Sequence, residues 1–228
     1  MARIGTFQLP DATVFDSRCE YVLGRVRRIV KLTSFFTRFA NRESFASTLD
    51  DLERELERFD RGETDLSIHE GRFLDGRRRK WTLTRDDDRC VGVGVLEILA
   101  NDRYERSESE NQESVSITSS PQVVNLAPSG NWNALPVLEL TATVALTNPS
   151  FSDGPRTIEC NLTLNPGESL ALDSEERTAV KNGVTNVLSF VSGEFVELDP
   201  GGATLTYQDE TGGGPQASLA VKWRDRWV

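Results

Sequence analysis

The sequence contains few of the residues that build metal sites and nucleophilic sites. Its 228 residues include one histidine, His69, and three cysteines, Cys19, Cys90 and Cys160, which lie far apart. One histidine and three scattered thiols do not supply the ligands of a structural zinc site. An odd number of cysteines cannot form a closed set of disulfides, so we expect three buried, reduced thiols. The sequence therefore predicts no metal site and no cofactor.

Long apolar runs and excess positive charge are missing as well. No stretch of eighteen apolar residues occurs, which argues against a membrane partner, and the N-terminus lacks the charged and then apolar layout of a secretory signal. The net charge of -10 argues against specific nucleic-acid binding, because phosphate contacts need a basic surface.

The first half of the chain combines strand patterns with one amphipathic helix. Apolar and basic residues alternate between Arg3 and Leu32, which favours β-strands. Further on, apolar side chains recur every three or four positions, as the buried stripe of a helix requires. The stripe consists of Phe45, Leu49, Leu52, Leu56 and Phe59. We expect it to pack on a sheet rather than to hold a cofactor.

The ends of this helix are marked by capping residues. Asn41 or Ser44 can accept the free N–H groups of the first turn, and Gly62 supplies a left-handed stop. These signals predict a helix over about residues 43–60. On its solvent side we expect two ion pairs at a spacing of four, Asp50 with Arg54 and Glu57 with Arg61.

The segment after the helix is expected to form a β-hairpin. Its two arms and the connection between them contain Leu66 and Ile68, Trp81 and Leu83, and Gly71 and Gly76. The sequence GRRRKW in this segment is the one basic block of an acidic chain. It fits a solvated hairpin tip, or a contact with an acidic patch on a neighbouring subunit, better than it fits DNA. The candidate assembly loop therefore consists of Arg77, Arg78, Arg79, Lys80 and Trp81.

The second half of the chain has the pattern of an all-β domain. Hydrophobicity drops before Pro121, where we place the boundary between domains 1–120 and 121–228. Seven short strands separated by turns rich in Asn, Pro and Gly then predict an antiparallel β-sandwich. They are expected in LPVLELTATVAL, RTIECNLTLN, ESLALD, VLSFV, EFVEL, ATLTYQ and ASLAVKW. In the last of these, Leu219, Val221 and Trp223 share one buried face, and residues 225–228 are expected to fray.

The sequence evidence for catalytic residues is weak. His69 is the only possible base of a Ser/His/Asp arrangement, and its alternating context favours a structural or solvated histidine. Gly92 and Gly94 alternate with valines as in a core strand, not as in a dinucleotide-binding loop. Glu197 and Asp199 are spaced like many carboxylate pairs that an acidic β protein contains by chance, so they are weak evidence for a glycosidase. We expect no enzymatic activity.

Two tryptophans allow a different kind of site. Trp132 and Trp227 could form a platform on which a sugar stacks, although packing in the core or at an interface explains them better. A carbohydrate-binding β-sandwich module is therefore the alternative function, and it accounts for the second half of the chain alone.

An ordered series of turn residues carries a family resemblance. The segments VVNLAPSGNWNALPVLELTAT, TLNPGESLALDSEERTAVKNG, VSGEFVELDPGGATLTYQ and SLAVKWRDRWV together resemble the C-terminal domain of distal tail proteins of long-tailed, siphovirus-type bacteriophages. The matching positions are Asn125, Gly130, Pro136, Gly167, Asp173, Asn182, Gly183, Gly193, Phe195, Leu198, Pro200 and Gly201.

The resemblance implies a structural role. It implies a galectin-like sandwich and an N-terminal domain, 1–120, that joins six copies in a ring between the tail tube and the tail tip or baseplate. The implied partners are the tail tube protein and the tip or hub proteins, and DNA would pass through the channel. The implied location is the distal end of the tail in the virion, after synthesis in the host cytoplasm. Head-to-tail contacts close such a ring without a catalytic pocket, and an acidic wall would repel DNA.

Overall fold

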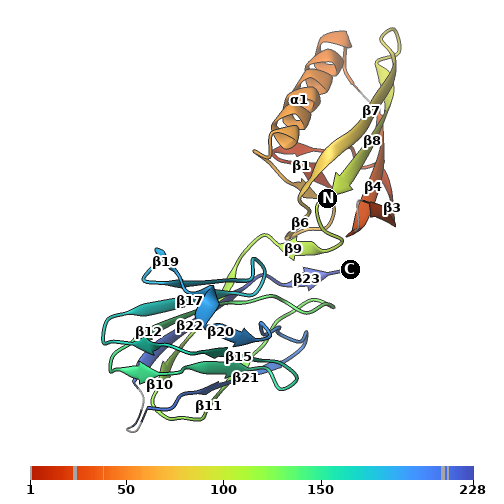
Figure 1. Ribbon diagram of the computed structural model, residues 1–228. Helices are drawn as coiled ribbons and strands as arrows, with labels where there is room; N and C mark the ends of the chain where they lie inside the picture. The colour runs from red at the N-terminus through yellow and green to blue at the C-terminus, as the bar shows by residue number, and fades with distance from the viewer. Residues whose placement is uncertain (1, 23–24, 38, 212–213, 215) are drawn as a thin grey trace. The chain divides into compact units, whose positions relative to one another are not determined.

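The chain folds into two compact units, Met1–Glu108 and Ser109–Trp227 (Figure 1). The computed structural model describes residues 2–22, 25–37, 39–211, 214 and 216–228. The boundary expected at Pro121 lies inside the second unit, because the polar segment before it is a strand, β10 (Asn111–Ile117). All seven residues of β10 pair with β22 (Ala217–Trp223). Most β10 side chains are exposed, which explains why the hydrophobicity of the sequence drops there.

The N-terminal unit is built on a four-stranded antiparallel sheet with the order β3-β4-β8-β7. Helix α1 lies along one face of this sheet (Figure 1). A small sheet, β2-β1-β5, and the pair β6 and β9 complete the unit. The elements are β1 (Arg3–Ile4), β2 (Phe7–Gln8), β3 (Val14–Val22), β4 (Arg25–Phe36), α1 (Arg42–Asp60), β5 (Leu66–Ser67), β6 (Arg72–Phe73), β7 (Gly76–Asp86), β8 (Val91–Ala100) and β9 (Glu105–Ser107).

The core of this unit lies between α1 and the sheet. The five residues of the predicted helical stripe are each at most 3% exposed, which confirms the expected stripe. Alternate residues of the two central strands face them, among them Leu32 on β4 and Ile98 on β8. Their neighbours Lys31 and Phe35 belong to the opposite face of the sheet and are exposed.

The caps of α1 agree with the sequence, but its predicted ion pairs do not. The backbone N–H of Ser44 donates to Asn41 Oδ1 over 2.9 Å, and Gly62 follows the helix with φ +71°. Arg54 contacts Asp51, three residues away, at 2.8 Å. Arg61 caps the C-terminus, where the chain leaves the helix, so its guanidinium contacts Glu63 at 2.6 Å instead of the preceding turn.

The hairpin of this unit has different arms from those expected. Its arms are β7 and β8, so Trp81 lies opposite Leu96. Leu66 pairs instead with Leu74, because the short segment between them folds back at Gly71, where φ is +73°. The sequence pattern joined two neighbouring hairpins into one.

The C-terminal unit is an antiparallel β-sandwich of a six-stranded sheet, β10-β22-β12-β17-β18-β19, and a five-stranded sheet, β11-β21-β14-β15-β20. Besides β10 and β22, its elements are β11 (Gln122–Leu126), β12 (Val137–Ala142), β13 (Leu146–Thr147), β14 (Ser150–Ser152), β15 (Thr157–Cys160), β16 (Thr163–Leu164), β17 (Ser169–Asp173), β18 (Thr178–Lys181), β19 (Thr185–Asn186), β20 (Val191–Gly193), β21 (Ala203–Gln208) and β23 (Arg226–Trp227). The mainly β fold class is confirmed. The segment VLSFV is mostly a 3-10 turn, Leu188–Phe190, and EFVEL makes only an isolated bridge at Leu198.

The end of the sandwich confirms one expectation and corrects another. Trp223 is 8% exposed and belongs to the core with Leu219 and Val221. The residues after it do not fray, because Asp225 is 7% exposed. Its carboxylate accepts hydrogen bonds from the Ser129 backbone N–H (2.8 Å), Asn111 Nδ2 (3.0 Å) and Trp223 Nε1 (3.1 Å).

We expect Asp225→Ala to lower the free energy of unfolding of the full chain by about 2–3 kcal/mol, because it leaves buried N–H donors without an acceptor. Urea unfolding monitored by tryptophan fluorescence measures this change. Glu176→Ala, at an exposed carboxylate, is the matched control and should change stability by less than about 0.5 kcal/mol. Equal stability of the two variants would contradict a structural role for Asp225.

Candidate assembly surface

The basic block lies on a strand and not on a loop or hairpin tip. Gly76 already pairs with Ala100, so the block forms the first half of β7. Arg78 belongs to the fold, since its guanidinium contacts the Asp60 carboxylate at the end of α1 at 2.5 Å. Arg77, Arg79 and Lys80 are exposed, so three of the five candidate residues present charge at the surface.

Strand β7 is one of two open edges of the four-stranded sheet. In the part of the chain that the structure describes, β7 pairs only with β8 and β3 pairs only with β4. These edges are long, with eleven residues in β7 and nine in β3. An open edge presents unpaired backbone N–H and C=O groups to any other strand that can approach. Both edges belong to the same sheet, so one copy of the chain offers two complementary sites for strand pairing.

The edge strand β3 also carries apolar side chains that the unit does not cover. Val14 is 62% exposed and Phe15 is 47% exposed. The ring of Phe15 meets the ring of His69 edge-on, with 5.8 Å between the centroids. The sequence analysis missed β3 as a candidate surface; the available signal was two adjacent apolar residues in a strand whose other residues are mostly polar.

Trp81 is held by a close approach to the backbone of β8. A Cβ atom added to Gly94 would lie 2.5 Å from the Trp81 ring, so only glycine leaves room for the indole. Gly92, two residues earlier on the same face of β8, accommodates the ring of Phe45 from α1. The alternating glycines therefore serve packing, which confirms that this segment is a core strand. Trp81 anchors β7 to the core, and the strand's other edge stays open.

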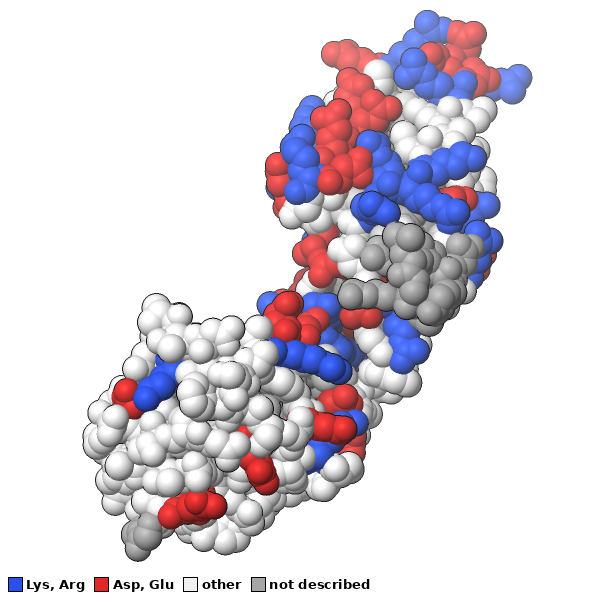
Figure 2. All heavy atoms as spheres, in the orientation of Figure 1, with Lys and Arg blue, Asp and Glu red and all other residues white. Residues whose placement is uncertain are grey.

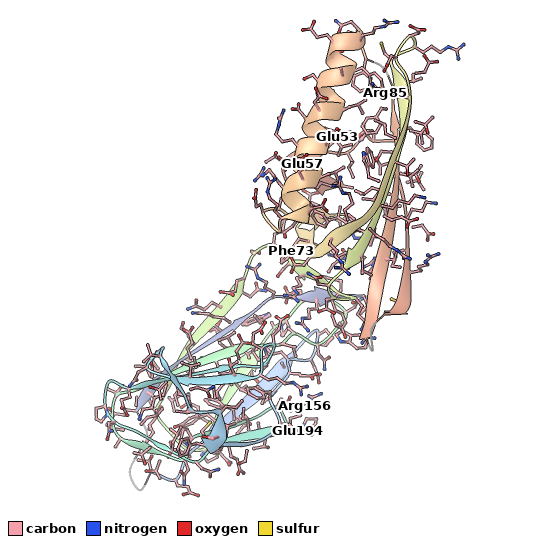
Figure 3. The ribbon with its side chains drawn as sticks, turned by 45° about the horizontal axis from the view of Figure 1, so that its top comes forward. Glu53, Glu57, Phe73, Arg85, Arg156 and Glu194 are labelled. Atoms are coloured by element: carbon pink, nitrogen blue, oxygen red, sulfur yellow. The ribbon has the colours of Figure 1, made fainter. Side chains whose placement is uncertain are left out.

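Charge is unevenly distributed over the two units. In the view of Figure 2, charged side chains of both signs crowd the N-terminal unit, whereas the sandwich presents mostly uncharged residues. On α1 the exposed carboxylates Glu53 and Glu57 lie on the solvent side of the helix (Figure 3). On this face, charge is therefore concentrated on the N-terminal unit.

His69 has a structural environment. Its Nδ1 lies 2.7 Å from a carboxylate oxygen of Glu105, and Glu105 also accepts from Arg28 Nη1 at 2.9 Å. Glu105 is 3% exposed, so the arginine and the histidine compensate a buried carboxylate. Among the described residues, no serine or threonine hydroxyl is hydrogen-bonded to the His69 ring, and the arrangement lacks the nucleophile of a Ser/His/Asp site.

The sandwich contains a hollow of about 560 Å³. Arg156 and Glu194 lie in its lining (Figure 3). Arg156 forms ion pairs of 3.0 Å with both Asp153 and Glu197, and Glu197 also accepts from Asn133 Nδ2 at 3.0 Å. Glu197 is thus used to fix this loop network, which is a structural use of one member of the candidate carboxylate pair.

The remaining candidates divide between the core and the surface. Trp132 is 40% exposed and does not pack in the core, whereas Trp227 is half-buried. Of the three cysteines only Cys160 is buried, and burial raises the pKa of its thiol to about 12. Cys19 is exposed on β3 and Cys90 is half-buried, so the expectation of three buried thiols is wrong for these two.

Helix α1 is also fastened by a buried carboxylate. Glu55 is 7% exposed and contacts Arg58 at 2.7 Å and the Thr6 hydroxyl at 3.2 Å. Burial raises the pKa of Glu55, but the hydrogen bonds from Arg58 and Thr6 outweigh it, and the pKa is lowered. A lowered pKa means that the ionised form stabilises the fold.

We expect Glu55→Gln to lower the free energy of unfolding by about 1–3 kcal/mol at pH 7, because it removes a charged acceptor. The contribution is complete above the unfolded-state pKa of about 4.3 and is lost as the pH falls through the lower folded-state value. The difference between the wild type and the variant should therefore shrink below about pH 4. Denaturant unfolding at several pH values measures it, with Glu53→Gln as the exposed control; a difference that is constant with pH would contradict the ion pair.

Comparisons with known proteins find a family match and a similar solved structure. Residues 129–227 match the family described as siphovirus-type tail component, C-terminal domain. The crystal structure of SPP1 Dit (gp 19.1), described as a paradigm of the hub adsorption apparatus in phages that infect Gram-positive bacteria, superimposes with a TM-score of 0.61. It is 12% identical, and the alignment covers 100% of this chain and 92% of that chain. No curated protein sequence matches this chain significantly. None of the helices among the described residues has the length and apolar character needed to cross a bilayer.

Proposed function

We propose that six copies of this chain form a ring at the distal end of a phage tail. The premise is that residues 129–227 match the siphovirus-type tail component family and that the whole chain has the fold of a distal tail protein. Together these findings support a structural role in a phage tail. The ring would join the tail tube to the tip or baseplate and leave an axial channel for DNA. The proposed partners are the tail tube protein on one side and tip or hub proteins on the other. The proposed location is the distal end of the tail in the virion, after synthesis in the host cytoplasm.

The observation that carries this proposal is the pair of open edges on one sheet. A cyclic assembly needs two different surfaces on each copy, so that one copy's first surface meets its neighbour's second. Strands β3 and β7 supply two such surfaces, and strand addition at an open edge is a general way of joining chains. The outer strands of the sandwich sheets are shorter, the longest being β10 with seven residues. We therefore assign the ring contacts to the N-terminal unit, with the basic strand β7, including Arg77 to Trp81, taking part in them.

The face of the sheet opposite α1, which we call the bare face, changes the expectation that the channel wall is acidic. Among its described residues, Lys31 and Lys80 stand beside Asp16 and Glu97. Arg18 and Arg77 belong to the same face through Ile29 and Leu99. A channel lined by this face would therefore present charges of both signs to DNA rather than an acidic wall.

We expect the purified chain to form a species of six times the protomer mass, or to form it when mixed with its tail tube protein, because each subunit contact repeats around a closed ring. Light scattering after size-exclusion chromatography and negative-stain electron microscopy measure mass and symmetry. A chain that stays monomeric at high concentration and with the tail tube protein would contradict the ring.

The hollow of the sandwich favours a second candidate function, carbohydrate binding. It combines Arg156, Glu194 and the partly buried ring of Phe195, which together offer donors, acceptors and an aromatic surface to a ligand. A glycan array with the full chain tests this candidate. Binding that Arg156→Ala leaves unchanged would exclude the hollow as the site.

A further inference from the structure

We propose that β7 of one copy pairs antiparallel with β3 of the next copy in one particular register, in which Asp16 lies opposite Thr84. This inference rests on the ring proposed above and specifies the strand pairing between its subunits. In this register Val14 lies opposite Asp86 and Phe15 opposite Arg85. The partner is a second copy of this chain, and the argument uses the internal register of the sheet, the lengths of its edges and their charges.

The internal register defines rows of residues that cross all four strands. Asp16 pairs with Lys31, Lys31 with Glu97, and Glu97 with Lys80. Directly opposite residues of antiparallel strands point to the same face, so this row lies on the bare face and alternates in charge from edge to edge. We describe each possible register between copies by its shift, which is the number of residues by which it departs from a simple continuation of this row. In the unshifted register, Lys80 of one copy would lie opposite Asp16 of the next.

The two faces of the sheet restrict the departure to an even number of residues. A shift of one residue would put the core-side residues of β3 level with the bare-face residues of the next copy's β7. Trp81 and Phe15 both belong to rows on the helix-covered face, through Leu96 and Leu32. An even shift keeps both aromatic rings on that face, where the neighbour's α1 covers its own β7.

Ring closure argues against a shift of zero, because pairing β7 of each copy with β3 of the next closes the sheets of all copies into one barrel. Strands closed into a barrel must tilt, and the tilt requires a stagger between the first and the last strand. A stagger of four residues for each four-stranded copy makes the shear equal to the number of strands. The same ratio holds in eight-stranded barrels of shear 8, whose strands tilt by about 36°. This tilt lies in the range of about 35–45° that closed barrels adopt.

Edge length and charge select the same stagger. A shift of four places all nine residues of β3, Val14–Val22, opposite residues 78–86 of β7. The same shift in the opposite sense leaves most of β3 without a partner strand. A shift of two in the favourable sense also pairs the whole of β3, but it sets Arg18 directly opposite Lys80, and opposed like charges destabilise a strand pair. With four, Arg18 comes opposite Thr82 instead, and the two like charges are no longer opposed.

The register gives the exposed ring of Phe15 a partner in the next copy. Phe15, which is 47% exposed, comes opposite Arg85, near the far end of β7 (Figure 3). A guanidinium over an aromatic ring is a favourable pair. The irregularity between Arg78 and Lys80 then falls at the end of the shared ladder, where it interrupts little pairing.

Thiol crosslinking measures this register. The reactive cysteines are first removed as Cys19→Ser and Cys90→Ser, and Cys160 stays because it is buried. Asp16→Cys is then combined with Thr84→Cys in one chain, and with Lys80→Cys in the control chain; all three sites are exposed. A crosslinker with a span below about 8 Å distinguishes the two, because four residues of strand cover about 13 Å.

We expect the Asp16→Cys, Thr84→Cys chain to give covalent multimers of up to six copies, with at least about tenfold higher yield than the Asp16→Cys, Lys80→Cys control. A higher yield from the control would overturn the register in favour of the unshifted row and leave the ring intact. Little crosslinking in both chains would overturn the edge pairing. In that case a hexameric mass of the wild-type chain shows that the ring survives through other contacts, and a monomeric wild type shows that the ring fails too.

Discussion

The N-terminal unit depends on the burial of its sheet on one face only. Helix α1 supplies one stripe of five apolar residues, and the sheet can bury against it only the alternate residues that face the stripe. The packing needs room, which Gly92 and Gly94 provide by letting two aromatic rings approach the backbone of β8. With a single helix available, the opposite face keeps exposed residues such as Lys31 and Phe35 beside the buried pair Ile29 and Leu99. Among the described residues, no further strand pairs with either edge of the sheet. The assembly surface follows from this shortage of covering elements.

Open edges normally have to be protected. Soluble proteins shorten them, charge them or cover them, because an uncovered edge invites pairing with other chains. Here β3 and β7 are long, and both carry charge, with Asp16 and Arg18 on one and Arg77 and Lys80 on the other. Charge restricts which strand and which register can pair. The same residues therefore oppose random aggregation and permit one specific contact, in which each edge is closed by a copy of the other.

The sequence predicted the parts of the fold in which one local signal decides the structure. The stripe, its Asn41 cap and the burial of Trp223 follow from periodicity and capping, and they agree with the structure. The domain boundary did not, because β10 is a polar strand that is stable only through its pairing with β22, about a hundred residues later. Asp225 was missed for a similar reason: two of its three donors, Asn111 and Ser129, come from distant parts of the chain. The basic block is not the expected hairpin tip, because the ladder that makes it a strand involves residues of β8, which the local sequence does not reveal.

The two units differ in the length of their open edges, and this difference separates their roles. Within the sandwich, Asp225 accepts hydrogen bonds from three donors of its own unit, and Arg156 is held by two carboxylates. The N-terminal unit fixes its own interior in the same way, through Glu55 and Glu105, yet leaves two rows of backbone groups on β3 and β7 that no other described strand of the chain pairs with. Unpaired backbone groups on a rigid frame gain the most from meeting another strand, because the frame has already paid the entropy of ordering them. The sandwich sheets also end in outer strands, but these are shorter, with seven residues in β10, two in β19, five in β11 and three in β20. The unit with the longer open edges is thus the one suited to hold subunits together, and the sandwich is suited to be carried by it.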